Sequence, residues 1–421
     1  MGVRYTMNVH EDPAVALAVK ELALEGYEGP GKPGVETIEK YRWLRDTGTR
    51  LWLDTGDIEA ASKVWSSEIE ALTTNNTLVN QVVQTGIMDS VVTYAARKIR
   101  EIRPEISEQD LVIEIAFLVN AKLALSIVGK LGAHVSVELH PDTASDIKQT
   151  LTFARRYYEI NKSHFYVKVP MTPDGFIATR LLSLEGIPVN YTLGFSARQN
   201  YLAARFAKPM FVNVFLGRLN SLVEDNGLGK PENVGEKVTL ASDEAVKALR
   251  GSYREIPTSQ IAASMRGGAQ LPVLAGVDVF TIPPKAAREY LDMEVSKGDV
   301  RRRTSSELHV ELEDTGLAKI VDVPSLWRID EKMIAFVEDA CQQADSIPNG
   351  HALVQLAEKH EVNLFREWTR EEREAIRAHG KIPDLAAWPG APLDDLMSIS
   401  ALETFAKDQG ALDERIRAML P

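Results

Sequence analysis

The segment Phe165-Tyr-Val-Lys-Val-Pro170 places one lysine inside an apolar, β-branched and aromatic run that is typical of a β-strand. Alternation along a strand puts the two valines on one face with Phe165, and Tyr166 with Lys168 on the other. Burying an unpaired ammonium is costly unless the group gives up its proton, and a neutral amine can attack a carbonyl carbon to form a Schiff base. The alternative is a lysine at a strand end whose charged head reaches water.

Short apolar runs like this one recur along the chain, separated by longer helix-like segments. The predicted strands are 51–54, 69–73, 134–139, 165–169, 188–192, 210–215, 260–264 and 278–282. The helix-like segments between them are 57–67, 78–99, 143–159, 173–185, 197–206 and 242–253, two of which begin with the predicted N-caps Asp57 and Ser242. Eight strand–helix units predict an α/β fold, most economically a (β/α)8 TIM barrel. An open doubly wound sheet is the alternative, but no G-x-G-x-x-G motif follows the first strand.

Two segments lie outside this pattern, so we predict three parts: an N-terminal extension (1–50), the barrel (51–300) and a mainly helical C-terminal extension (301–421). The first part contains the breaker-rich linker Gly29-Pro-Gly-Lys-Pro-Gly34. In the last part, helices are predicted at 331–343, 351–360 and 369–379. Two roles for this extension stay open: covering the mouth of the barrel, or forming a contact in a homo-oligomer.

Composition narrows the class of protein. The chain has 421 residues, 44% of them hydrophobic, and a formal net charge of −12, which argues against a general nucleic-acid binder. Its single cysteine, Cys341, excludes an internal disulfide and fits a reducing compartment. We find no secretion signal and no stretch that approaches a membrane span. The sequence therefore predicts a cytoplasmic protein without a nucleic-acid or membrane partner.

Polar side chains gather where the predicted strands end, which in a (β/α)8 barrel is where active sites form. They are Asp54, Thr73, Asn75, Glu138, Lys168, Thr192, Asn213, Arg218, Ser264 and Arg266. Alternation points Asp54 and Glu138 into the barrel beside Lys168. A purely structural polar core is the alternative, but such networks are costly unless every member is satisfied. For Arg218 alone, a surface ion pair is the corresponding alternative.

Several of these residues lie in short motifs, one per strand. The motifs are Leu53-Asp-Thr-Gly-Asp57, Leu72-Thr-Thr-Asn75, Val135-Ser-Val-Glu138, Val167-Lys-Val-Pro170, Glu185-Gly-Ile-Pro-Val-Asn-Tyr-Thr-Leu193 with Phe195-Ser196, Phe215-Leu-Gly-Arg218 and Ala263-Ser-Met-Arg266. In this order the set resembles the transaldolases and their relatives, the class I fructose-6-phosphate-type aldolases. The resemblance covers about residues 51–284 and says nothing about residues 1–50 or 300–421.

The resemblance implies a transaldolase of carbohydrate metabolism, in the pentose phosphate pathway, which needs no cofactor or metal. Lys168 corresponds to the Schiff-base lysine that attacks the C2 carbonyl of a ketose phosphate and keeps a dihydroxyacetone unit after the C3–C4 bond breaks. Asp54 corresponds to the group that takes the proton from the C4 hydroxyl. Glu138 and Thr192 correspond to the pair that activates the water of imine formation.

The same resemblance assigns the substrate contacts. Asn75 and Asn190 correspond to residues that hydrogen-bond the sugar hydroxyls, and Thr73, Asn213 and Phe215 belong to the same substrate pocket. The phosphate clamp consists of Arg218, Arg266 and Ser264, helped by the backbone N–H groups near Gly267-Gly268.

The chain departs from the family pattern at three places. Asn76 stands where the family usually has proline, Asn213 replaces a small serine or alanine, and the C-terminal extension is long. Both asparagines bear on the choice of substrate more than on the mechanism.

Three other functions stay open. A class I aldolase would release free dihydroxyacetone, but that branch tends to have tyrosine at the position of Phe215 and glutamine at that of Glu138. A metal-dependent aldolase is suggested only by Glu138-Leu-His140-Pro-Asp142, which lacks a third ligand. A non-catalytic binding or scaffold protein is suggested by the extension.

Overall fold

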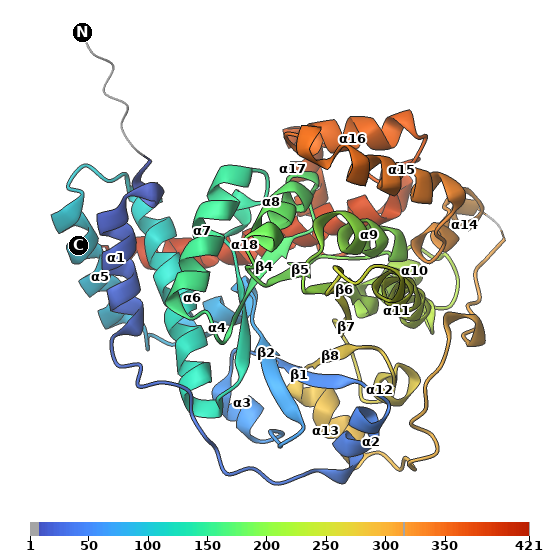
Figure 1. The fold of residues 1–421 in the computed structure, drawn as a ribbon, viewed down its shortest axis with the longest axis horizontal. Coiled ribbons are helices and arrows are strands. Elements are labelled where there is room, and N and C mark those ends of the chain that lie inside the picture. The colour runs from blue at the N-terminus through green and yellow to red at the C-terminus, as the bar shows by residue number, and fades with distance from the viewer. Residues whose placement is uncertain (1–7, 315, 421) are drawn as a thin grey trace.

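The computed structural model describes residues 8–314 and 316–420, and its centre is a closed barrel of parallel strands (Figure 1). Each strand pairs with the next in chain order, and β8 closes the ring on β1. The strands are β1 (Arg50–Asp54), β2 (Ile69–Thr73), β3 (His134–Glu138), β4 (Phe165–Pro170), β5 (Val189–Thr192), β6 (Phe211–Phe215), β7 (Ser259–Ala263) and β8 (Val279–Ile282). This confirms the predicted (β/α)8 barrel.

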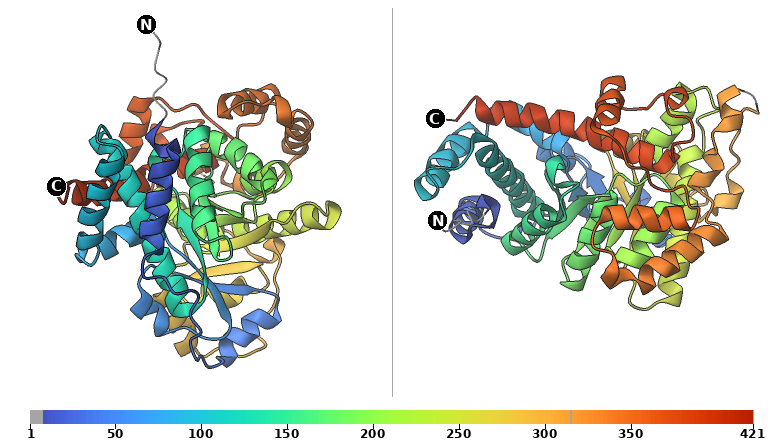
Figure 2. Two further views of the ribbon diagram at one scale, coloured as in Figure 1. Left: turned by 60° about the vertical axis from the view of Figure 1, so that its left-hand side comes forward. Right: turned by 90° about the horizontal axis from the view of Figure 1, so that it is seen from above.

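Helices surround the barrel and extend beyond it (Figures 1 and 2). Up to the end of the barrel they are α1 (Pro13–Leu24), α2 (Glu39–Asp46), α3 (Ile58–Ser62), α4 (Asn76–Gln84), α5 (Asp89–Ile102), α6 (Glu108–Leu131), α7 (Ile147–Ile160), α8 (Pro173–Leu184), α9 (Ala197–Leu202), α10 (Leu216–Asp225), α11 (Val234–Ser252), α12 (Gln270–Val273) and α13 (Pro284–Asp292). The C-terminal extension adds α14 (Gly316–Ile320), α15 (Glu331–Gln342), α16 (Gly350–Lys359), α17 (Arg370–His379) and α18 (Leu393–Arg417).

The sequence was a weaker guide to the helices than to the strands. Asp57 is the predicted N-cap of α3, and its Oδ1 accepts hydrogen bonds from the N–H groups of Glu59 and Ala60. Ser242 is not an N-cap, because α11 begins eight residues earlier and Ser242 lies inside it. The single helix predicted over 78–99 is two helices, separated by a turn in which Gly86 has a φ of 84°.

Inside the barrel, an aromatic layer lies toward the N-terminal ends of the strands. The rings of Trp52 and Tyr166 stack with centroids 5.5 Å apart, and Phe211 packs edge-on against Trp52 at 4.6 Å. Asp54 and Lys168 each follow one of these residues by two positions. Asp54 and Lys168 therefore point into the barrel as Trp52 and Tyr166 do, but one layer closer to the C-terminal ends of the strands, as alternation predicts.

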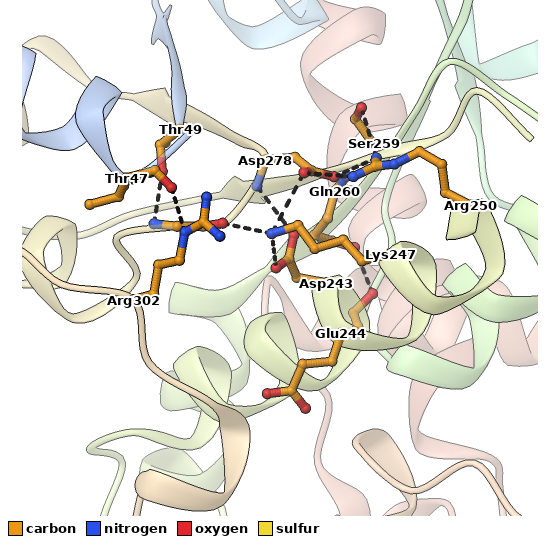
Figure 3. A network of polar contacts seen from close by, with 12 residues as sticks. Thr47, Thr49, Asp243, Glu244, Lys247, Arg250, Ser259, Gln260, Asp278 and Arg302 are labelled. Atoms are coloured by element: carbon orange, nitrogen blue, oxygen red, sulfur yellow. Dashed lines mark hydrogen bonds and ion pairs between the residues drawn. The ribbon is translucent and has the colours of Figure 1, made fainter. Parts of the chain in front are cut away.

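A polar network lies at the opposite end of the barrel from this lysine, where β7 and β8 begin (Figure 3). The guanidinium of Arg250 donates to both carboxylate oxygens of Asp278, at 2.8 and 3.0 Å. Lys247 donates to Asp243 at 2.6 Å, and Asp243 accepts the N–H of Asp278. Arg250 also donates to the Ser259 hydroxyl at 3.3 Å, so these bonds tie α11 to the starts of β7 and β8, at the end where (β/α)8 barrels carry stability rather than chemistry.

Helix α6 has 24 residues and is long and apolar enough to cross a membrane by length and composition. The expectation that no stretch approaches a membrane span is therefore wrong on that criterion. However, 89% of its most apolar window is buried inside the protein, where it packs against α1, β3 and α18. We read α6 as a core helix that is apolar on all sides because all of its sides are covered.

The C-terminal extension packs directly on the barrel helices. Figure 2 shows α18 as the long red helix, and it lies against α4 and α6. Near its start, the buried Asp394 accepts from the guanidinium of Arg198 on α9 at 2.7 Å. From α15, Glu338 pairs with Arg205 at 2.8 Å. The division into three parts at residues 50 and 300 stays a prediction.

Asp395 makes the stability of this extension depend on pH. Burial raises the pKa of its carboxyl to about 7, even though the Trp368 indole and the Arg366 N–H donate to it, and the neighbouring Asp394 adds to the rise. A raised folded-state pKa means that stability is greatest in acid and is lost as the pH rises through about 7.

Between pH 5.5 and 8.5 we therefore expect the wild type to lose about 2 kcal/mol of unfolding free energy relative to Asp395→Asn. The asparagine keeps an acceptor for both donors and does not ionise. Urea titrations of both proteins at the two pH values measure this difference, and equal losses would contradict it.

Candidate active site

A pocket opens at the C-terminal ends of the strands, and ten of the twelve predicted site residues line it. These are Asp54, Thr73, Asn75, Lys168, Asn190, Asn213, Phe215, Arg218, Ser264 and Arg266. The other two, Glu138 and Thr192, are almost fully buried in the barrel on the strands that flank β4. The lining also includes residues that we did not predict, among them Thr281, Lys381 and Phe405.

Lys168 lies on β4 with 4% of its surface exposed. Its Nζ donates to the carbonyl oxygen of Thr74 at 3.0 Å and approaches Oε2 of Glu138 at 3.4 Å. Residues 138 and 168 are also register partners on β3 and β4. The lysine therefore does not reach solvent at a strand end. Its nitrogen is held between a carbonyl and a carboxyl group at the floor of the pocket.

Glu138 is 2% exposed, and burial raises the pKa of its carboxyl above the usual range. The Lys168 ammonium and the backbone N–H of Asn76 act in the opposite direction. Asn76 is the first residue of α4, directly after the N-cap Asn75. Proline has no N–H, so the residue usual in the family at this position could not make this contact.

Asp54 lies at the end of β1, close enough to Lys168 for the two charges to interact. Its Oδ1 accepts from the Thr73 hydroxyl at 2.8 Å, and Thr73 is 2.6 Å from the Thr281 hydroxyl on β8. Burial raises the pKa of Asp54, while Lys168 and the Thr73 hydrogen bond lower it in part. The site thus holds two buried carboxyl groups whose pKa values are raised by burial and partly lowered by the charge of the same lysine, an arrangement typical of acid–base chemistry.

On β5, beside the strand of Lys168, two buried polar atoms have no hydrogen-bond partner among the described residues. They are Oδ1 of Asn190 and the hydroxyl of Thr192, both buried. The Asn190 amide nitrogen is fixed by Ser136 at 2.8 Å, which orients the free oxygen. Buried polar atoms are rarely left unpaired, so these two are suited to hold a water molecule or a substrate group.

Asn213 lines the pocket, but the wall already uses its amide. Its Oδ1 accepts the N–H of Gly194 at 3.0 Å, and its Nδ2 donates to the carbonyl of Tyr191. The side chain therefore joins the end of β5 to β6. Asn213 thus contributes mainly to the shape of the pocket wall, and its role in substrate binding stays a prediction.

Arg218 and Arg266 lie at the other end of the pocket, with Ser264 between them in sequence. Ser264 has a φ of 61°, a conformation that favours glycine and that tends to occur at functional sites. Gly217 is required here, because a Cβ at that position would meet the Ser264 carbonyl oxygen at 2.3 Å. The two arginines are brought together by this close approach of the β6 and β7 ends.

The predicted help from backbone N–H groups near Gly267-Gly268 in binding a phosphate stays a prediction. The N–H of Gly267 donates to Oε1 of Gln270 at 3.3 Å, and the N–H of Gly268 donates to Glu289 at 3.0 Å. Both groups are already engaged within the protein. A phosphate that used these donors would have to displace the side chains of Gln270 and Glu289.

The residues suggested for a metal site do not converge. Glu138 faces Lys168 inside the barrel, whereas His140 lies beyond the end of β3 and its Nε2 is 3.2 Å from Asp413 on α18. Within residues 8–314 and 316–420, no group of three or more His, Cys, Asp or Glu side chains could hold a metal ion.

Fold and site together define a (β/α)8-barrel enzyme of the aldolase and transferase type. Residues 51–340 match the family described as Transaldolase/Fructose-6-phosphate aldolase. The chain belongs to this family.

Curated relatives carry the name transaldolase at modest identity. The protein of Agrobacterium fabrum is 29% identical over 344 residues, which are 78% of this chain and 97% of the relative. That of Allorhizobium ampelinum is 28% identical over 268 residues, 62% of this chain and 80% of the relative. That of the yeast Kluyveromyces lactis is 27% identical over 311 residues, 70% and 82% of the two chains.

The contact between Asn76 and Glu138 leads to a pH prediction. Proline is well tolerated at the first position of a helix, and Asn75 already has the extended conformation that proline demands of its predecessor. Asn76→Pro removes the N–H that favours ionised Glu138, so the pKa of Glu138 should rise and the acid limb of the kcat/KM profile should move to higher pH.

Asn76→Ala is the matched control, because it removes the side chain and keeps the N–H. We expect its acid limb to stay in place. If both variants moved the limb equally, the side chain rather than the backbone donor would be responsible.

Proposed function

We propose that this protein is a transaldolase that transfers a dihydroxyacetone unit from a ketose phosphate to an aldose phosphate through a Schiff base on Lys168. The observation that carries the proposal is the buried Lys168 Nζ, held between the Thr74 carbonyl and Glu138 at the floor of a pocket that also contains Asp54 and two arginines. The transaldolase relatives support it.

Lys168 attacks the C2 carbonyl of the ketose, and loss of water from the carbinolamine gives an iminium ion. Glu138 and Thr192 hold and activate this water. The iminium accepts the electron pair of the C3–C4 bond as that bond breaks, while Asp54 takes the proton from the C4 hydroxyl. The aldose phosphate leaves, and an enamine of dihydroxyacetone stays on the lysine. Addition to the acceptor aldehyde runs the same steps in reverse.

The remaining residues bind the sugar. Asn75 and Asn190 hydrogen-bond its hydroxyl groups from the two sides of Lys168. Arg218, Arg266 and Ser264 bind the phosphate of the sugar. The hydrogen bonds from the two arginines to the phosphate are charge-assisted and therefore stronger than bonds between neutral groups. The Thr73 hydroxyl orients Asp54.

Phe215 favours transfer over release of free dihydroxyacetone. It lines the pocket and packs edge-on against Phe195, with centroids 5.7 Å apart. A phenylalanine has no hydroxyl to help protonate the enamine, so the intermediate waits for an acceptor aldehyde.

The test measures free dihydroxyacetone from fructose 6-phosphate without an acceptor, and ketose formation after an aldose phosphate is added. Slow release with fast transfer supports the transaldolase. Efficient release of dihydroxyacetone without an acceptor would show aldolase activity instead. No turnover of any sugar phosphate in a panel would favour the non-catalytic binding or scaffold protein.

A further inference from the structure

The phosphate end of the pocket contains more positive charge than the barrel neutralises. Arg218, Arg266 and Lys381 all line it, and none of the three forms an ion pair within the described parts of the chain. Arg218 is only 7% exposed, and burial, followed by the nearby charge of Arg266, lowers its pKa to about 10. A buried cation without a partner is costly, so this end of the pocket is suited to an anionic ligand.

Lys381 comes from the C-terminal extension, in the loop between α17 and α18, beyond the family match that ends at residue 340. Its carbonyl oxygen accepts from Nη1 of Arg218 at 3.5 Å and from the Ser400 hydroxyl at 3.3 Å. Two residues later, the Pro383 carbonyl accepts from the amide of Asn226 at 3.1 Å. The loop is therefore fixed to α18 and to the C-terminal end of α10, while Lys381 itself is exposed and lines the pocket.

Helix α18 adds a second contact to the same arginine. The Phe405 ring lines the pocket, and its centroid is 5.8 Å from the Arg218 guanidinium carbon, a cation–π distance. Asp408, one turn further on, offsets part of the positive charge at Arg218, but it also accepts a hydrogen bond from Thr77 of α4. The extension thus forms one wall of the phosphate end of the pocket.

We propose that the C-terminal extension completes the anion subsite, with the Lys381 ammonium contacting the substrate phosphate as a third cation beside Arg218 and Arg266. The inference rests on the proposed function for the identity of the anion as a sugar phosphate. A phosphate dianion offers three terminal oxygens. Arg218 lies at the start of α10, directly after β6, and Arg266 follows β7, whereas Lys381 reaches the pocket from the C-terminal extension.

The first experiment uses inorganic phosphate as the probe and the full-length protein. Calorimetric titration should show that Lys381→Ala weakens phosphate binding about fivefold at low ionic strength, the effect of losing one partly exposed charge. The difference should shrink in high salt, because exposed charges are screened. Lys407→Ala is the matched control, since Lys407 is an exposed lysine on α18 that does not line the pocket, and it should bind phosphate as the wild type does.

The second experiment compares one aldose acceptor with and without its phosphate. Lys381→Ala should lower kcat/KM about fivefold for the phosphorylated acceptor and leave the unphosphorylated acceptor unchanged. Equal phosphate affinities of the wild type and Lys381→Ala would overturn the proposal, and so would an equal loss in Lys407→Ala. The transaldolase assignment is tested separately by borohydride trapping, and it fails if no adduct forms on Lys168. The titration with inorganic phosphate still tests the role of Lys381 in that case.

Discussion

Lys168→Met should abolish carbon–carbon bond cleavage and leave the barrel folded. Without the amine there is no iminium to accept the electrons of the breaking bond, so kcat should fall by at least about 10⁴-fold, as when a covalent nucleophile is removed. Methionine fills a similar volume in a site that is 4% exposed. Removing one partner of a buried pair usually destabilises a protein, but Glu138 can become neutral because burial already raises its pKa.

Borohydride reduction in the presence of fructose 6-phosphate measures the same event directly. Mass spectrometry should find the reduced dihydroxyacetone adduct on Lys168 in the wild type and none in Lys168→Met. Lys168→Arg is the matched control, since it keeps a positive charge beside Glu138 but cannot form an imine, and it should be equally inactive. An adduct on another lysine, or activity in either variant, would contradict the assignment.

The position of Lys168 could be predicted because it depends on local pattern alone. Strand alternation places residues 52 and 54, or 166 and 168, on one face whatever the rest of the chain does. Closure of the barrel then turns these faces inward, and the C-terminal strand ends meet at one mouth. For this reason ten of the twelve predicted site residues line a single pocket.

Contacts between distant segments could not be predicted in the same way. Nothing in the sequence near Lys381 or Phe405 shows that they reach the pocket, because their position depends on how α18 packs against α4 and α6. The engagement of the Gly268 N–H by Glu289 is likewise a tertiary contact. Thr281 is different: it lies on a predicted strand, and alternation could have found it.

The prediction of helix boundaries from the sequence failed for a related reason. Helix α11 begins at Val234, although Ser242 is a good N-cap by residue type, because a buried serine inside a helix can bond elsewhere. The Ser242 hydroxyl donates to Oε1 of Gln260 at 2.6 Å, on the adjacent β7. Tertiary hydrogen bonding therefore overrides the local preference.

Asp54→Asn should separate imine formation from bond cleavage. Asparagine keeps an oxygen that can accept the Thr73 hydrogen bond, but it cannot take the proton of the C4 hydroxyl. Loss of a general base at this step should lower kcat by about 10² to 10⁴-fold. When dihydroxyacetone itself is added to Asp54→Asn, borohydride should still trap it on Lys168, because imine formation uses Glu138 and Thr192 and needs no bond cleavage.

The pH profile provides an independent check on Asp54. Burial raises the pKa of its carboxyl, and the ionised form is the one that accepts the proton, so wild-type cleavage should fall as the pH decreases through a value above the usual carboxyl range. In Asp54→Asn the acid limb due to Asp54 should disappear, and only the limb due to Glu138, which Asn76→Pro moves, should remain. Thr281→Val is the comparison variant: it removes only the hydroxyl behind Thr73 and should cost far less than the loss of Asp54. If Asp54→Asn cleaved within tenfold of wild type, or failed to trap dihydroxyacetone, Asp54 would not be the base for cleavage, and the role would pass to another group near the C4 hydroxyl.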